Sequence, residues 1–375
     1  MKSKVYACDL RAGYRENLFG KLDRLLDIAG MGDRIKAGDL VAIKLHFGEK
    51  GNTGFIRPIF VRRVVDKVKA LDAQPFLTDA NTLYGGARND SVHHMITAIQ
   101  NGFAYSVVDA PILIADGLKG TSYTEVNIDQ AHIQTAYIAT DIYEADALIS
   151  LAHFKGHELT GFGGTLKNIG MGCAARKGKL AQHSDLSPKV KSRECIACGD
   201  CVETCGQGAI SIMDIEGRPR ARINPDLCIG CAECILACGQ SAIRVQWDKS
   251  VPAFMHKMVE YTAAVLDNKG GKTLFVNFLT RISPACDCLA HTDAPVVGDI
   301  GILASLDPIA LDQASADLVN QQQGHAATCP QAGIGAGEDK FRALYPEVDW
   351  TIQLDYGQKL GLGVTDYDLE WLENV

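Results

Sequence analysis

Two copies of one cysteine spacing constrain the fold of this chain more than any other feature of its sequence. The first copy has the pattern C-x2-C-x2-C-x3-C and consists of Cys195, Cys198, Cys201 and Cys205. The second copy begins 33 residues later and consists of Cys228, Cys231, Cys234 and Cys238. In this spacing three thiolates surround one face of an iron-sulfur cubane, and the fourth points to a second cubane. The spacing therefore predicts two [4Fe-4S] clusters in a bacterial-type dicluster ferredoxin module.

The crossed ligand pattern assigns each cysteine to a cluster. One cluster would be bound by Cys195, Cys198, Cys201 and Cys238, and the other by Cys228, Cys231, Cys234 and Cys205. The repeat extends beyond the ligands, since CIACGDCVETCGQGAISI and CIGCAECILACGQSAIRV share several residues around them. Zinc is the alternative metal, but its tetrahedral sites use pairs of ligands separated by a long spacer. The spacing favours iron-sulfur clusters, which imply low-potential electron transfer.

Composition and charge limit the expected location of the protein in the cell and the classes of partner that it could bind. The chain has a net charge of -8, so no basic surplus is available to neutralise a nucleic acid backbone. The sequence has no signal peptide and no apolar run of the roughly 20 residues that a membrane helix needs. We therefore expect a cytoplasmic protein without nucleic acid or membrane partners. Because the cytosol keeps thiols reduced, the thirteen cysteines favour metal binding over disulfides.

The rest of the sequence alternates between segments typical of strands and of helices. Strands are expected at residues 40–45, 75–77, 105–108, 112–114, 147–151, 273–279 and 300–304. Helices are expected at residues 57–71, 91–101, 134–144, 252–267 and 308–320, the last of them capped by Asp307. This alternation predicts an α/β host domain with a mainly parallel sheet, formed by residues 1–189 and 249–375. The α+β ferredoxin module is then an insertion at residues 190–248.

Polar residues follow several of the expected strands, where ligands bind in open α/β sheets. Lys44 and His46 follow the strand at 40–45, and Asp79 follows the strand at 75–77. These three residues are candidates for binding a cofactor. His153, Lys155 and His157 follow the strand at 147–151 in the same way. We expect these side chains to meet at one edge of the sheet.

The segment from His153 to Gly172 is the most informative part of the host domain. It reads HFKGHELTGFGGTLKNIGMG, which is poor material for core packing but suits a backbone close to a ligand. His153, His157 and Lys167 are catalytic candidates, and Gly163 and Gly164 are candidates for cofactor contacts. A phosphate-binding loop is excluded, because Phe162 stands where that motif requires lysine. An anion or metal site remains.

Five cysteines lie outside the two runs. Cys8, Cys173 and Cys329 are expected to be buried thiols, because a free cysteine packs as a small apolar residue. Cys286 and Cys288 differ, since they flank Asp287 in a loop after the strand at 273–279. Two thiols beside a carboxylate can hold a thiophilic metal or act as a redox pair. We therefore take Asp287 as a catalytic candidate and the two cysteines as candidate extra metal ligands.

Several separated motifs together resemble one known family over nearly the whole chain. These motifs are KLHFGEKGNTGFIRP, TDANTLYGG, HFKGHELTGFGGTLKNIGMGCA, the two cysteine runs, ISPACDC and DIGILASLDPIALDQAS. The chain resembles the iron-sulfur-centre proteins that contain the domain of unknown function numbered 362. The resemblance implies an iron-sulfur protein typical of anaerobes, with a ferredoxin module embedded in a host domain. It also implies that the His/Lys/Gly segment and the Cys-Asp-Cys triplet belong to one site.

These observations lead to three functional hypotheses. In the first, a redox enzyme passes electrons from a soluble partner protein through the clusters to a small-molecule substrate in the host domain. Lys167 or a histidine would supply protons there, and an additional metal or small cofactor could occupy the site. In the second, the protein carries electrons between partner proteins and performs no chemistry of its own. In the third, it delivers a metal or a cluster to an acceptor protein.

Overall fold

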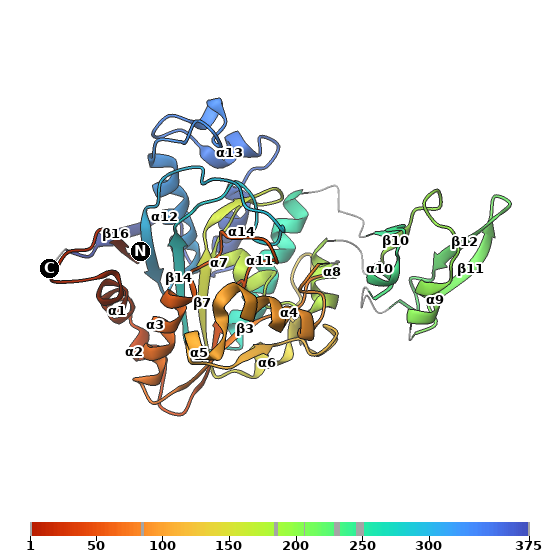
Figure 1. Ribbon diagram of the computed structural model, residues 1–375, viewed down its shortest axis with the longest axis horizontal. Helices are drawn as coiled ribbons and strands as arrows, with labels where there is room; N and C mark the ends of the chain where they lie inside the picture. Colours follow the sequence, from red (N-terminus) through yellow and green to blue (C-terminus); the bar gives the residue numbers. More distant parts are fainter. Residues whose placement is uncertain are drawn as a thin grey trace.

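The computed structural model describes residues 2–83, 86–183, 187–205, 207–228, 233–244 and 251–373, and its centre is an eight-stranded sheet (Figure 1). The strands of this sheet, in spatial order, are β16 (Tyr367–Trp371), β1 (Ser3–Asp9), β15 (Gly301–Ser305), β14 (Thr273–Leu279), β7 (Ala147–His153), β2 (Leu40–Lys44), β3 (Gln74–Asp79) and β4 (Ile112–Ile114). The run from β14 to β4 is parallel throughout, and β16 is parallel to β1. Only β15 runs antiparallel to both of its neighbours. The prediction of an α/β fold with a mainly parallel sheet is confirmed.

Two hydrophobic cores lie on the two faces of this sheet, because successive strand residues point to opposite sides. One core contains Ala42 and Phe275 together with residues of α7 (Thr165–Gly170), α11 (Val251–Asp267), α12 (Pro308–Gln321) and α14 (Thr351–Lys359). The other core contains Ile43 and Val276 together with residues of α1 (Leu18–Ile28), α2 (Met31–Arg34), α3 (Pro58–Lys69) and α5 (Tyr105–Val108). Helices therefore cover both faces, and the central strands are buried on both sides.

Shorter elements complete the α/β part of the molecule. The helical ones are α4 (Ser91–Ala98), the π-helix η1 (Ile99–Phe103), α6 (Thr140–Glu144), α8 (Arg176–His183), the 3-10 helix η2 (Gln331–Gly333) and α13 (Lys340–Leu344). Two antiparallel pairs lie outside the main sheet, β5 (Tyr123–Asn127) with β6 (Thr135–Ala139) and β8 (Lys155–His157) with β9 (Gly161–Gly163). None of the described helices combines the length and the apolar character that crossing a membrane requires.

Two of the expected elements are wrong. Residues 105–108 form the single-turn helix α5 instead of a strand, and the turn ends at Asp109 in the left-handed conformation. Residues 134–144 were expected to be one helix, but they form β6 followed by the short helix α6. Thr135–Ala139 form a strand because β6 pairs along its whole length with β5. The other expected strands and helices are present, with shifted ends, and η1 continues α4.

Residues 187–244, here called the cysteine-rich lobe, form a second group of elements. They comprise β10 (Lys189–Val190), α9 (Asp200–Thr204), β11 (Ile210–Ile215), β12 (Arg218–Ile223), α10 (Glu233–Ala237) and β13 (Ile243–Arg244). The four strands pair with one another, β10 with β13 and β11 with β12, and a small core of their own lies between them. Figure 1 shows the lobe beyond α8, at one end of the molecule. The predicted module boundary at residues 248 and 249 lies outside the described residues.

Candidate functional site

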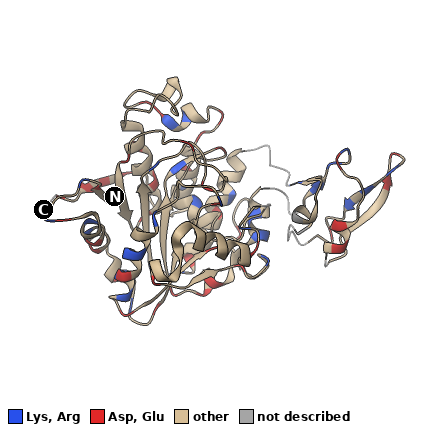
Figure 2. Ribbon diagram, in the orientation of Figure 1, with Lys and Arg blue, Asp and Glu red and all other residues tan. Residues whose placement is uncertain are grey.

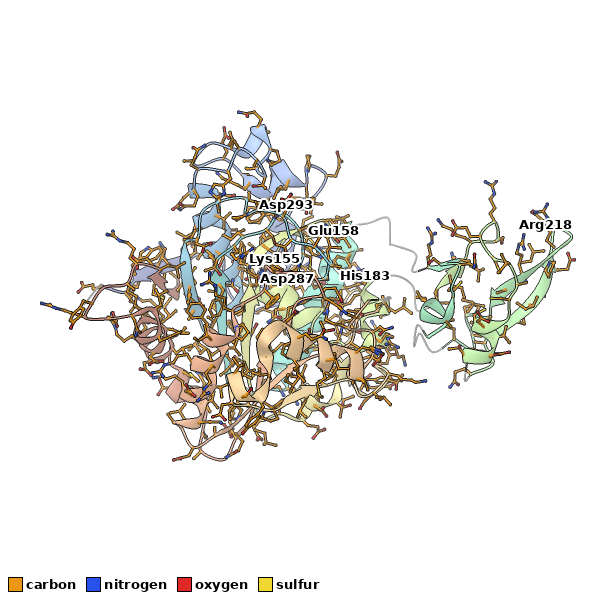
Figure 3. The ribbon with its side chains drawn as sticks, in the orientation of Figure 1. Lys155, Glu158, His183, Arg218, Asp287 and Asp293 are labelled. Atoms are coloured by element: carbon orange, nitrogen blue, oxygen red, sulfur yellow. The ribbon has the colours of Figure 1, made fainter. Side chains whose placement is uncertain are left out.

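A cavity of about 100 Å³ lies at the edge of the sheet where the parallel strands β2, β3 and β7 end. It is lined by an unusual number of cationic and imidazole side chains, namely Lys44, His46, Arg88, Lys155, His157, Lys167, Lys179 and His183. Asp79 and Glu158 are the acidic residues of the lining. Figure 3 shows Lys155, Glu158, His183 and Asp287 gathered in this region. Figure 2 shows acidic and basic residues interspersed over the molecule as a whole, so the cationic character belongs to this cleft.

Lys44 and Asp79 form a buried ion pair on the floor of the cavity. The ammonium of Lys44 lies 3.0 Å from Asp79 Oδ1 and donates a hydrogen bond of 2.9 Å to Asn168 Oδ1. Burial alone would raise the pKa of Asp79, but the charges of Lys44 and its cationic neighbours lower it well below the usual value. Burial lowers the pKa of His46, whose Nδ1 accepts a hydrogen bond from the Gly48 backbone. Asp79 is therefore ionised and His46 is neutral.

Arg88 reaches the same cavity from the loop after β3 and is almost completely buried. Its Nε donates to Glu49 Oε2 at 3.1 Å, and its Nη1 lies 3.8 Å from Asp79 Oδ2. Its Nη2 is buried and has no hydrogen-bond partner among the described residues. Leaving a guanidinium nitrogen unpaired in the interior is costly, so this nitrogen suits a ligand that accepts a hydrogen bond.

His153 and Asp287 form a second buried pair beside the cavity. His153 Nδ1 lies 3.0 and 2.9 Å from the two oxygens of Asp287, and its Nε2 lies 2.8 Å from the carbonyl of Thr280. Both neighbours can only accept, so both ring nitrogens must donate. Lys155 Nζ approaches Asp287 Oδ2 at 3.3 Å, and the two cations hold the pKa of this carboxyl well below its usual value despite burial. Neither His153 nor Asp287 lines the cavity.

Cys286 and Cys288 lie on either side of Asp287 and approach each other. Lys167 Nζ donates to Cys286 Sγ at 3.4 Å, and the Cys288 backbone N–H donates to the same sulfur at 3.4 Å. A hydrogen bond from the Cys288 thiol lowers the pKa of Cys286 well below its usual value, against burial and with the help of Lys167 and His157. The same hydrogen bond raises the pKa of Cys288 well above its usual value. These opposite shifts and the contact with Lys167 favour Cys286 as the thiolate of the pair.

Close backbone contacts at glycine bring these segments together. A Cβ atom on Gly156 would lie 2.0 Å from the carbonyl oxygen of Pro284, so only glycine allows β8 to touch the loop that carries the two cysteines. A Cβ atom on Gly164 would lie 2.4 Å from Asp312 Oδ1, and this carboxylate accepts from the Thr165 backbone N–H. Gly164 lines the cavity, whereas Gly163 packs beside Lys167.

The structure therefore brings most of the expected residues to one cleft. Lys44, His46, Asp79, His157, Gly164, Lys167 and Cys288 line the cavity, and His153, Gly163, Cys286 and Asp287 lie directly behind the lining. Sequence reasoning missed Arg88, Lys179 and His183. Lys179 and His183 lie on α8, whose polar composition is typical of an exposed helix although most of its residues are buried. No pattern in the sequence marks these three side chains.

The cysteine-rich lobe contains a separate small cavity of about 20 Å³. Its lining includes Cys195, Cys198, Cys201 and Cys238, with glycine, alanine, isoleucine and one glutamine completing the wall. Backbone N–H groups donate to cysteine sulfurs in the lobe, from Ala221 to Cys195 at 3.4 Å and from Ala242 to Cys238 at 3.2 Å. In the part of the chain that the structure describes, no three His, Cys, Asp or Glu side chains converge as ligands of a single metal ion do. Cys231 lies outside the described residues.

Comparison with known proteins gives a family and two remote structural neighbours. A lactate racemase apoprotein from Thermoanaerobacterium thermosaccharolyticum is 12% identical with a TM-score of 0.36, and the match covers 75% of this chain and 51% of that one. A protein from Thermotoga maritima is 10% identical with a TM-score of 0.42, covering 84% of this chain and 61% of that one. The chain thus spans about half to three fifths of these two proteins. No curated protein matches the sequence. The family model described as a domain of unknown function, DUF362, matches residues 41–317, and the chain belongs to that family.

Proposed function

We propose that the protein is an iron-sulfur redox protein that passes low-potential electrons through two [4Fe-4S] clusters to a reaction site in the cleft of the α/β part. One observation carries this proposal. Cys195, Cys198, Cys201 and Cys238 line the same cavity of the lobe, although Cys238 belongs to the other cysteine run. This is the crossed set that the spacing of a dicluster ferredoxin requires.

The lobe provides a suitable environment for such clusters. Apolar residues, including Ala221 and Ile243, are buried around the cysteines and would limit access of water. The backbone N–H groups that point at Cys195, Cys205 and Cys238 match the hydrogen bonds that tune cluster potentials. When bound, the clusters would supply one-electron transfer. The second cluster would use Cys205, Cys228 and Cys234, which the structure describes, together with Cys231.

A contact between the lobe and the α/β part supports an internal electron path. Ile235, the residue after Cys234, packs against Leu83 and Leu180. Leu83 also lines the cavity that contains the lysines and histidines. Ile235 therefore lies next to the rim of the cleft, which supports a relay from the lobe into the cleft.

The cleft is suited to an anionic small molecule. Lys155, Lys179 and Arg88 line it, and Arg88 Nη2 has no hydrogen-bond partner among the described residues. Burial lowers the pKa of Lys179 to about 8, and a bound anion would favour its charged form. A carboxylate or phosphate would satisfy these donors. His157 lies within the same lining and would move protons to and from the bound molecule. Lys167 would stay charged, because the neighbouring cysteines outweigh burial and raise its pKa.

A carrier without chemistry of its own is the second candidate, and one observation favours it. Ile196, next to two of the cysteines, has 62% of its surface exposed, and Ile212 and Met213 are exposed nearby. Exposed apolar residues beside a redox centre suit brief docking of a soluble redox protein. The redox enzyme and the electron carrier both need a soluble redox partner. They differ in whether the cleft binds a substrate.

Anaerobic purification followed by iron, sulfide and zinc analysis tests the clusters. We expect about eight irons per chain, two [4Fe-4S] signals in the electron paramagnetic resonance spectrum after reduction, and no stoichiometric zinc. Cys198→Ala should lose about half of the iron, whereas the matched variant Cys329→Ser, at a buried thiol outside the lobe, should keep all of it. Zinc in place of iron, or full iron content in Cys198→Ala, would refute the proposal.

A thermal-shift screen with small carboxylates and phosphates separates the two candidates. A ligand that binds the cleft of the folded protein should raise its melting temperature. We expect Arg88→Gln to abolish this increase, and Arg62→Gln, on the surface helix α3, to leave it unchanged. If no anion stabilises the wild-type holoprotein, the carrier function replaces the enzyme.

A further inference from the structure

We propose that Cys286 and Cys288 form a redox-active pair that cycles between a dithiol and a disulfide, and that this pair reduces small anionic disulfides in the cleft. This inference deepens the proposed function by naming the two-electron acceptor of the cleft. It depends on the proposed function only for the source of the electrons.

The loop folds back so that the backbone of Cys288 lies against the sulfur of Cys286. A turn returns the chain on itself, with the Leu289 backbone N–H donating to the Cys286 carbonyl at 3.1 Å. Both thiols are free, and the backbone N–H of Cys288 already lies 3.4 Å from Cys286 Sγ.

The residue between the two cysteines anchors the loop from the other side. Asp287 is fully buried and points to His153 and Lys155, at 2.9 and 3.3 Å. The Asp287 carbonyl also accepts from the Glu49 backbone N–H at 3.0 Å. These contacts fix the loop while its sulfurs face Lys167 and the cavity. Asp287 and His153 are therefore positioning residues.

The environment of the sulfurs favours redox chemistry over metal binding. The Lys167 ammonium lies 3.4 Å from Cys286 Sγ, in the place where a thiolate-bound cation would sit. A fixed positive charge at that distance stabilises a thiolate and repels a divalent metal. Cys288 lines the cavity, while Cys286 is only 1% exposed behind it. This gives one sulfur that can meet a substrate and one that can close the disulfide.

The reaction balances in two half-steps. Cys288 sulfur attacks a disulfide RSSR as its proton passes to Cys286, forming a mixed disulfide and releasing RS⁻. Cys286, losing that proton, then attacks Cys288 sulfur, forms the Cys286–Cys288 disulfide and releases RSH. Two electrons and one proton restore the Cys286 thiolate and the Cys288 thiol. The reductant is a low-potential one-electron carrier, the cluster pair of the lobe, used twice. The sum is RSSR plus two electrons and one proton giving RSH and RS⁻.

The cations of the cleft define the class of substrate. Arg88, Lys155 and Lys179 lie in the same lining as Cys288, so a disulfide that carries carboxylates should bind better than a neutral one. Dithiodiglycolate is a small disulfide with two carboxylates, and hydroxyethyl disulfide is its neutral counterpart of similar size. These two compounds are suitable probes.

The first experiment measures the pair itself. Anaerobic holoprotein is equilibrated in glutathione buffers of graded potential, alkylated and examined by mass spectrometry. We expect one two-electron transition that converts Cys286 and Cys288 into a disulfide, with Cys329 alkylated throughout. Cys288→Ser should abolish the transition, and Cys329→Ser should keep it. In Cys288→Ser, Cys286 should be alkylated at every potential. If Cys286 and Cys288 of the wild-type protein are also alkylated at every potential, the inference is wrong.

The second experiment supplies electrons from reduced methyl viologen and measures thiol release from the two probes. We expect reduction of dithiodiglycolate at least tenfold faster than reduction of hydroxyethyl disulfide, and loss of this activity in Cys288→Ser. Equal rates in wild type and Cys288→Ser would overturn the substrate assignment. Iron content and cluster spectra of the same samples separate the two ideas. If the clusters are intact but Cys286 and Cys288 form no disulfide, this inference alone is refuted. If the two cysteines form and break a disulfide but the protein contains no clusters, the proposed function alone is refuted.

Discussion

The imidazole of His94 is buried next to the cleft, and this burial should make the folded protein less stable in acid. His94 is fully buried, packs edge-on against Phe47 at 5.8 Å, and has no hydrogen-bond partner for either ring nitrogen among the described residues. Burial lowers the pKa of His94 from 6.5 to about 3, although Asp79 lies 3.8 Å away and opposes the shift. The folded protein therefore keeps this ring neutral where the unfolded chain would protonate it.

This difference predicts a loss of stability in mild acid. Because the folded pKa is depressed, the contribution of His94 is complete above pH 6.5 and is lost as the pH falls toward 3. Between pH 7.5 and 5 the share of His94 in the loss of unfolding free energy should be about 2 kcal/mol, and His94→Phe should remove that share. Urea unfolding at both pH values measures this, with His93→Phe, at an exposed neighbour, as the control. An unchanged loss in His94→Phe would contradict the assignment.

The charge of Lys167 should control the reactivity of Cys286. Removing the ammonium in Lys167→Met leaves the thiolate without its cation, so the pKa of Cys286 should rise and its alkylation at pH 7 should slow at least tenfold. Lys167→Arg keeps a positive charge and should retain most of the rate. Alkylation as a function of pH, followed by mass spectrometry, gives the midpoint for each protein. Identical midpoints for wild type and Lys167→Met would show that Lys167 does not stabilise the thiolate.

Residues could be placed in the cleft from the sequence where a parallel strand ends beside them. Lys44 and Asp79 follow this rule, because β2 and β3 are adjacent and parallel and their ends meet. Arg88 could not be placed in this way, since it follows β3 by several residues and reaches the cavity only through its pairing with Glu49. The partners of a buried charge depend on loop packing, which leaves no periodic signal in the sequence.

Among the elements, α12 depends on its N-terminal cap. Asp307 accepts from the backbone N–H groups of Ile309 and Ala310 at 2.8 and 2.9 Å, as its sequence position predicted. Its second oxygen accepts from Ser3 Oγ and from the Val364 backbone N–H, which joins both ends of the chain to this helix. The cap therefore stabilises more than one helix end.

Asp307→Ala should destabilise the α/β part by about 2 kcal/mol, at the upper end for a cap because two further donors lose their acceptor. Asn17→Ala removes the corresponding cap of α1, which has only the Phe19 and Gly20 donors, and should cost about 1 kcal/mol. Chemical unfolding of both variants measures the difference. Equal losses would mean that the contacts of Asp307 with Ser3 and Val364 contribute nothing.

Long elements with a clear period were predictable, and short or non-local ones were not. The strand β14 and the helices α3, α11 and α12 are close to their expected ranges because burial and periodicity agree along them. The strands β1 and β16 were not predicted, because β1 joins the sheet by pairing with β15 and β16, which lie near the other end of the sequence. The antiparallel direction of β15 follows from the connection after β14, which local patterns do not encode.

At the scale of the whole molecule, the lobe and the α/β part differ in what stabilises them. The α/β part has two extensive cores on the faces of one sheet. The small core of the lobe has seven buried residues among those described, and three of them are the cysteines Cys195, Cys201 and Cys234. A core of this size does not stabilise a fold without a metal or another cross-link. If the lobe holds the proposed clusters, its folding should therefore depend on them, and the folding of the α/β part should not.

Removal of iron tests whether the folding of the lobe, but not that of the α/β part, depends on the proposed clusters. When a chelator and an oxidant remove the proposed clusters, we expect backbone amides of β11 and β12 to lose their protection from hydrogen exchange, because metal binding would provide the folding energy of the lobe. Amides of β7 and β14 should keep their protection, since these strands are buried in the eight-stranded sheet. A variant with residues 190–248 replaced by a short Gly-Ser linker serves as the matched control and should show the same protection in β7 and β14. Equal loss of protection in β7, β14 and the lobe would show that the chain folds as one cooperative unit around its clusters.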